Sequence, residues 1–197
     1  MDQVEAFILA GGASSRMGTD KSQLLIAEQT LIQRIANTLF QVFSSVTIVG
    51  REVEDSRLKT ATDIYPNWGA LGGLHAALKA CSTEWAFVIA CDLPFVSTEM
   101  IKSLIKIKDG YDAVVPIQPD GRPQPLSSMY KVTACLQPAG QLIEAGKRRP
   151  LDLLDTVNTR WVSFSELSQL TDSQNFFLNI NTPEDYYEAT QRAANKS

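Results

Sequence analysis

The sequence predicts a single α/β domain of three layers, in which a mostly parallel sheet lies between two layers of helices. Short apolar runs alternate with segments of helical periodicity, which is typical of repeated strand–helix–strand units. The apolar runs are nearly continuous, as in strands that are buried on both faces of a sheet. The length of 197 residues fits one domain spanning 1–197, and the sequence shows no internal repeat or linker.

Three strands and two helices are expected in the first half of the chain. Thr30 and Gln33 form a capping box before apolar residues at helical spacing, which predicts an amphipathic helix. A second helix is expected to start near Gly72-Gly73. In chain order, the expected elements are a strand at 4–10, a helix at 31–43, a strand at 46–49, the helix from about 72, and a strand at 85–90.

The second half continues the alternation. Ser97 is the expected N-cap of a helix with Glu99 in its first turn. Pro138 is expected to break or open a later helical stretch, because proline lacks the backbone N–H. Thr182 is the expected N-cap of a final helix. The strands expected here lie at 111–117, at 124–132 after a turn at 119–121, and at 176–180.

Charge and cysteine content exclude several classes of protein. With 18 Lys and Arg against 22 Asp and Glu, the net charge of −4 gives no general attraction for nucleic acids or anionic membranes. The three cysteines show no spacing typical of a disulfide framework or a zinc site. No apolar run reaches the roughly 18 residues of a membrane span, and the first residues lack the basic region of a signal peptide. We therefore expect a cytoplasmic protein.

A glycine-rich segment follows the first strand and is the first candidate ligand site. It reads LAGGASSRMGTDK at 9–21 and lies at the carboxyl end of a predicted parallel strand, where open α/β sheets bind ligands. Glycines let backbone N–H groups approach a polyphosphate, and Arg16 and Lys21 can neutralise its charge. The spacings of the P-loop and of the dinucleotide fingerprint are both absent. A surface turn with solvated cations is the alternative interpretation.

Two aspartates are further candidates. The strand at 85–90 runs into Cys91-Asp92-Leu93-Pro94, so Asp92 shares an edge with the glycine segment if the two strands are parallel neighbours. A carboxylate beside a polyphosphate requires a cation between them, which makes Asp92 the candidate Mg²⁺ ligand; the alternative is an Asp that caps a turn. Asp63 precedes glycines that open a helix, whose N–H groups could hold an anion, although a solvated turn fits equally well. His75 is expected to be a packed or surface residue.

The glycine segment resembles the signature LAGGxSxRMGxDK of the molybdenum cofactor guanylyltransferases, the molybdopterin-guanine dinucleotide synthase family. The resemblance covers essentially the whole chain and implies a Rossmann-like nucleotidyltransferase domain. It also implies transfer of GMP from GTP to the phosphate of molybdopterin carrying molybdenum, with Mg²⁺ as cofactor and pyrophosphate as product. The further matching segments are GALGGL at 69–74, CDLPF at 91–95, QPLSSMY at 124–130 and NINTPED at 179–185.

The resemblance also implies roles for individual residues. Lys21 would contact the phosphates, and Asp63 would contact the nucleotide. Asp92 would bind both the nucleotide and Mg²⁺, and Asn181 would lie toward the pterin. Arg16, Lys21 and Asp92 are the expected catalytic residues, because an attacking phosphate needs alignment and charge neutralisation rather than an activated Ser, Cys or His. The residues expected to line the guanine nucleotide are Leu9, Ala10, Gly11 and Gly12.

The chain departs from the family pattern at two positions, and two other functions are compatible with the sequence. Gly50 stands before Arg51 where relatives often have Asn, and Ala70 stands where Pro is common. One alternative is a cytidylyltransferase acting on molybdopterin or a sugar-alcohol phosphate, because fold and loop are shared. The other is a non-catalytic nucleotide-binding protein. Molybdoenzymes or their chaperones are compatible recipients of the product.

Overall fold

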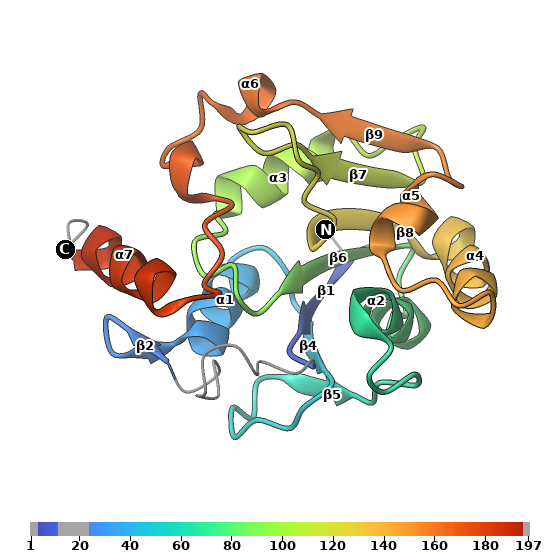
Figure 1. Ribbon diagram of the computed structural model, residues 1–197, viewed down its shortest axis with the longest axis horizontal. Helices are drawn as coiled ribbons and strands as arrows, with labels where there is room; N and C mark the ends of the chain where they lie inside the picture. The colour runs from blue at the N-terminus through green and yellow to red at the C-terminus, as the bar shows by residue number, and fades with distance from the viewer. Residues whose placement is uncertain (1–3, 12–23, 195–197) are drawn as a thin grey trace.

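The computed structural model describes residues 4–11 and 24–194. Their main sheet has seven strands (Figure 1). The strand order is β5-β4-β1-β6-β8-β7-β9, and β2 pairs with β3 in a small separate hairpin. The strands are β1 (Val4–Leu9), β2 (Leu25–Ile26), β3 (Gln29–Thr30), β4 (Val46–Val49), β5 (Lys59–Ala61), β6 (Trp85–Ala90), β7 (Ala113–Pro116), β8 (Ser127–Lys131) and β9 (Thr159–Val162).

The sheet is parallel in one half and mixed in the other. Strands β5, β4, β1 and β6 pair in parallel, as the β-α-β alternation predicts. Strand β8 runs antiparallel to both β6 and β7, whereas β9 runs parallel to β7. The reversal occurs because β7 and β8 are joined by a short connection through the predicted turn at 119–121, where Gly121 adopts a φ of +83°.

Helices cover both faces of the sheet, which confirms the three-layer α/β/α prediction (Figure 1). Apolar residues of α1 and α3 pack on one face, and those of α2, α4 and α5 pack on the other. The helices are α1 (Leu31–Phe40), α2 (Gly69–Ala80), α3 (Thr98–Lys106), α4 (Val132–Glu144), α5 (Pro150–Leu154), α6 (Phe164–Leu167) and α7 (Pro183–Ala194). None of the helices described here is long and apolar enough to cross a membrane.

Several helix signals are confirmed in detail. The Gln33 backbone N–H donates to Thr30 Oγ1 at 3.1 Å, and the Thr30 N–H donates to Gln33 Oε1 at 2.9 Å, which completes the predicted capping box. Ser97 Oγ accepts a bond from the Met100 N–H at the start of α3. Cys81, Cys91 and Cys135 are all free thiols, in agreement with the absence of a disulfide pattern.

The prediction that Pro138 breaks or opens a helix was wrong. Pro138 lies inside α4, which starts at Val132 and continues to Glu144. Three side chains of α4, Cys135, Ala139 and Ile143, are buried, and this tertiary packing outweighs the lost backbone hydrogen bond.

The prediction of a strand at 176–180 was also wrong. The segment follows a short 3₁₀ helix at Ser173–Asn175 and forms no ladder. Its apolar pattern reflects burial without strand pairing, because Phe176, Phe177 and Ile180 are core residues. The short edge strands β5 and β9 were missed because their side chains are mostly not buried, so they leave no apolar run in the sequence.

Candidate functional site

The candidate site lies where β1, β4 and β6 end at the same edge of the sheet. The Ala10 N–H donates to Val49 O, and the Cys91 N–H donates to Leu9 O, both at 3.0 Å. Strands β1 and β6 are parallel neighbours with Leu9 opposite Ala90, as the prediction for Asp92 required. The structure therefore brings Asp92 to the same edge as the start of the glycine segment.

Gly11 and Gly50 form a close contact between two backbone segments at this edge. Gly50 has a φ of +88°, and a Cβ on it would lie 2.8 Å from Gly11 Cα. A Cβ on Gly11 would lie 3.3 Å from Gly50 Cα. Side chains at these positions would force the two segments apart, so bare backbone is required here. The glycine before Arg51 is therefore one that the local backbone geometry demands.

Asp63 occupies the turn between β5 and α2. Its Oδ1 accepts a hydrogen bond from the Tyr65 N–H at 3.0 Å, which is the geometry of an Asx turn. The side chain is half-buried. Asp63 thus has a structural role as a turn residue, and the expected contact with a nucleotide would be made in addition to it.

Asn181 lies next to the segment that carries Asp92. The Ile180 N–H donates to the Asp92 backbone carbonyl at 3.0 Å. Asp185 Oδ2 accepts bonds from the N–H groups of both Asn181 and Thr182 at 2.8 Å, which fixes this turn at the start of α7. Two segments far apart in the sequence therefore meet at the site (Figure 1).

A basic segment beside α2 was missed in the sequence analysis. Lys147, Arg148 and Arg149 are exposed between α4 and α5. The Leu71 N–H donates to Arg148 O at 3.2 Å, and the Arg148 guanidinium lies 4.6 Å from the Trp68 ring centroid. Three consecutive cations between Gly146 and Pro150 were the signal that could have identified this segment.

Gly73 lies over the end of β1. A Cβ on Gly73 would lie 3.3 Å from Leu9 Cδ1, so α2 approaches Leu9 closely only because this position lacks a side chain. The glycines that open α2 therefore place the start of this helix against the first strand of the candidate site.

His75 is packed, as the sequence analysis favoured. Its ring lies edge-on to Tyr65 with the ring centroids 5.2 Å apart. Burial, aided by the charge of Lys79 and opposed by that of Asp63, lowers the pKa of His75. The imidazole is therefore neutral at physiological pH.

The metal prediction depends on a small set of donors. Among residues 4–11 and 24–194, no group of three or more His, Cys, Asp or Glu is arranged to hold a metal ion. A single carboxylate at the edge of the sheet suits Mg²⁺ that takes its other ligands from phosphate oxygens and water. Asp92 therefore fits a substrate-bound cation. Gly12, Arg16 and Lys21 lie outside the described residues, and their roles stay predictions.

Comparisons with known proteins agree with the resemblance in the sequence. The model of the MobA-like NTP transferase domain matches residues 6–158. A probable molybdenum cofactor guanylyltransferase from Pelotomaculum thermopropionicum is 34% identical over 198 residues, covering 99% of this chain and 96% of that protein. A molybdenum cofactor guanylyltransferase from Desulfosudis oleivorans is 32% identical over 194 residues, covering 96% of this chain and 95% of that protein.

A solved structure is similar over the same extent. The crystal structure of molybdopterin-guanine dinucleotide biosynthesis protein A from Archaeoglobus fulgidus superposes with a TM-score of 0.82 at 26% identity, covering 97% of this chain and 99% of that one. Family model, full-length relatives and fold agree, and the chain belongs to the MobA-like NTP transferases, in the family of the molybdenum cofactor guanylyltransferases.

Proposed function

We propose that this protein transfers GMP from GTP to the phosphate of molybdopterin carrying molybdenum, releasing pyrophosphate. The observation that carries the proposal is the meeting of the Gly11–Gly50 backbone contact with Asp92 at one sheet edge in a member of this family. Residues 1–197 act as one nucleotidyltransferase domain in this proposal. In the same proposal, the protein acts in the cytoplasm, and molybdoenzymes or their chaperones receive the product.

The described residues suit the nucleotide side of this reaction. Leu9 ends β1, and Ala10 and Gly11 follow it beside Gly50, so a planar base or ribose would approach without meeting a side chain at either glycine. Asp63 would add a carboxylate contact from its turn. Gly12, Arg16 and Lys21 would follow directly and hold the triphosphate.

Catalysis in this proposal is alignment and charge neutralisation. The acceptor phosphate is already a nucleophile at neutral pH, so no side chain has to remove its proton. Mg²⁺ bound by Asp92 would neutralise charge on the α-phosphate and the leaving pyrophosphate. Arg16 and Lys21 would supply further positive charge during the displacement. The neutral, packed His75 agrees with a mechanism that needs no general base.

Asn181 would face the second substrate. Its backbone is fixed beside Asp92 by Asp185 and by the Ile180 bond, so a ligand held near Asn181 would lie close to the metal ligand. The exposed cations at 147–149 add positive charge at the start of α2, which is favourable for two anionic substrates.

The alternative functions differ in the base or in turnover. A cytidylyltransferase would share this edge of the sheet, and a nucleotide-binding protein without activity would keep the glycines but would not need a metal ligand. The full-length relatives named as guanylyltransferases favour GTP.

Incubation with GTP, Mg²⁺ and molybdopterin tests the proposal directly. We expect a guanylylated pterin and pyrophosphate, detected by mass spectrometry, and much less product with CTP. A preference for CTP would establish the cytidylyltransferase. Tight GTP binding without product would establish the binding protein.

A further inference from the structure

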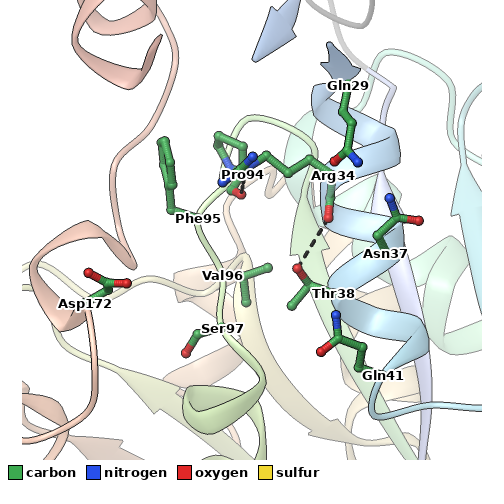
Figure 2. Close-up of a pocket in the computed structure, with 10 residues that line it drawn as sticks. All are labelled: Gln29, Arg34, Asn37, Thr38, Gln41, Pro94, Phe95, Val96, Ser97 and Asp172. Atoms are coloured by element: carbon green, nitrogen blue, oxygen red, sulfur yellow. Dashed lines mark hydrogen bonds between the residues drawn. The ribbon is translucent and has the colours of Figure 1, made fainter. Parts of the chain in front are cut away.

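A polar pocket lies beside the loop that carries Asp92. Its volume is about 340 Å³, and it lies between α1 and the segment after β6 (Figure 2). Arg34 of α1 extends across it toward Pro94 and Phe95 (Figure 2). The remaining lining residues are Gln29, Asn37, Thr38, Gln41, Val96, Ser97 and Asp172.

Arg34 makes its side-chain contacts with this loop. Its Nε donates to the Pro94 carbonyl at 3.2 Å. Its guanidinium carbon lies 5.2 Å from the centroid of the Phe95 ring, a cation–π arrangement. Pro94 and Phe95 are the second and third residues after Asp92, so both contacts act on the loop that holds the carboxylate.

The environment of Arg34 is unusual for a charged residue on a helix. Half-buried arginines usually pair with a carboxylate or extend their charge into water. Within residues 4–11 and 24–194, no carboxylate forms an ion pair with Arg34. Burial accordingly lowers the pKa of the Arg34 guanidinium. A neutral carbonyl and an aromatic face are the groups that compensate its desolvation, and both belong to the loop.

The loop is fixed at its beginning by backbone hydrogen bonds, and Phe95 also packs in an apolar cluster with Leu31 and Ile180. The Cys91 N–H is bonded to Leu9 O, and the Asp92 carbonyl accepts from the Ile180 N–H. These bonds fix the beginning of the loop to β1 and to the turn before α7. Beyond Asp92, the Leu93 N–H donates to Ala90 O and the Val96 N–H donates to Leu93 O within the loop. The bond from Arg34 to the Pro94 carbonyl ties this part of the loop to α1.

We propose that Arg34 is a positioning residue, which holds the 93–95 segment against α1 and thereby orients the Asp92 carboxylate toward the reacting phosphates. The proposal rests on the proposed role of Asp92. Lysine is a poor substitute, because it has neither the Nε donor nor the planar guanidinium that stacks on the ring.

The chain offers a matched control in Arg57. Its guanidinium also lies 5.2 Å from a phenylalanine ring, that of Phe40 at the end of α1. Arg57 differs because it is paired with Asp55 at 2.6 Å and has no contact with the Asp92 loop. Arg57→Ala thus removes an Arg–Phe contact at the same distance, and it removes side-chain bonds to Asp55 and Asn37 rather than to the Asp92 loop.

The test measures GMP transfer in Arg34→Ala, Arg34→Lys and Arg57→Ala, with GTP affinity and the Mg²⁺ requirement determined for each. We expect Arg34→Ala to lower kcat by about 10-fold or more, since small misplacements of a catalytic group cost up to about 100-fold. The Kd for GTP should change by less than about 2-fold, and half-maximal activity should require more Mg²⁺. Arg34→Lys should recover only part of kcat, and Arg57→Ala should keep it.

A double variant connects the effect to Asp92. In the Asp92→Asn background, Arg34→Ala should cause no further loss of kcat, because the group that Arg34 orients is gone. Independent, multiplying losses would overturn the proposal, as would normal kcat and Mg²⁺ dependence in Arg34→Ala. If Arg34→Ala does not fold, normal kcat and Mg²⁺ dependence in Arg34→Lys would overturn it too. Normal turnover in Asp92→Asn would instead contradict the proposed role of Asp92, and the positioning role with it.

Discussion

The parallel half of the sheet (β5, β4, β1 and β6) and the mixed half (β8, β7 and β9) use their polar groups differently. In the parallel half, the strand ends lead into Gly11, Gly50, Asp63 and Asp92, the residues proposed to contact the ligand. The strands of this half all point their carboxyl ends to one edge, as ligand sites of open α/β sheets require.

The mixed half uses its polar groups to hold the fold together. Tyr130 is fully buried and donates its hydroxyl to the Pro125 carbonyl at 2.7 Å. Ser128 Oγ donates to the Gln124 carbonyl at 2.7 Å, also in the interior. If the proposed function is right, one sheet combines a ligand-binding edge with a half whose polar groups stabilise the fold, so substitutions in the first half should lower activity and those in the second should lower stability.

The largest effect is expected for Asp92→Asn in the parallel half. The substitution keeps the shape and removes the charge that would hold Mg²⁺, so turnover should fall by about 100-fold or more. The melting temperature should stay close to that of the wild type, and binding of metal-free GTP should change little. A folded variant with normal turnover at limiting Mg²⁺ would show that Asp92 does not bind the metal and serves only as a turn residue.

Gly50→Ala should affect both stability and ligand binding. Its φ of +88° and the 2.8 Å approach of Gly11 Cα predict a destabilisation of about 1–3 kcal/mol, together with GTP binding weakened by about 10-fold. Gly121→Ala is the matched control, since its φ is +83° and nothing lies within 4 Å of the added Cβ. The control should show the strain without the loss of GTP affinity. Equal GTP affinity in both folded variants would show that Gly50 does not belong to the nucleotide-binding site.

Tyr130→Phe tests the mixed half. The Pro125 carbonyl would lose its donor in a buried place, which should lower the free energy of unfolding by about 1–2 kcal/mol in urea titrations. The kcat of the folded variant should match that of the wild type. A loss of turnover without a loss of stability would show that the mixed half also takes part in the reaction.

The smallest effect is expected at alkaline pH and concerns Cys135 of α4, which packs against Ala113 and Tyr130 of the mixed half. Burial raises the pKa of Cys135 from 9.0 to about 12, so the unfolded chain loses this proton before the folded one does. Stability should therefore be complete below about pH 9 and fall as pH rises toward 12. Urea titrations at pH 8, 9 and 10 should give a shallower decline for Cys135→Ala. An unchanged slope would mean that other groups, such as the buried Tyr130, account for the decline.

The sequence predicted the parallel half better than the mixed half, for physical reasons. Buried parallel strands leave nearly continuous apolar runs, and the capping box at Thr30 and Gln33 is a local signal, so both were recognised. The edge strand β9 and the position of Pro138 inside α4 depend on tertiary packing, which leaves no pattern within a short window.

The candidate site shows the same division. Asp92 could be placed because a residue after a parallel strand must lie at the carboxyl edge of the sheet. The contact of Gly50 with Gly11 and the packing of Arg148 beside Leu71 join segments that are distant in sequence, and neither could be predicted from residue spacing.

Nucleotide binding at the parallel edge can be tested directly by NMR, with backbone amide signals assigned for the whole chain. Addition of GTP with Mg²⁺ should shift the amide signals of Gly11, Gly50 and Asp92 at the parallel edge most strongly. The amides of β7, β8 and β9 should remain nearly unchanged. Shifts centred on β7 to β9, with those of Gly11, Gly50 and Asp92 unmoved, would contradict the assignment of nucleotide binding to the parallel half.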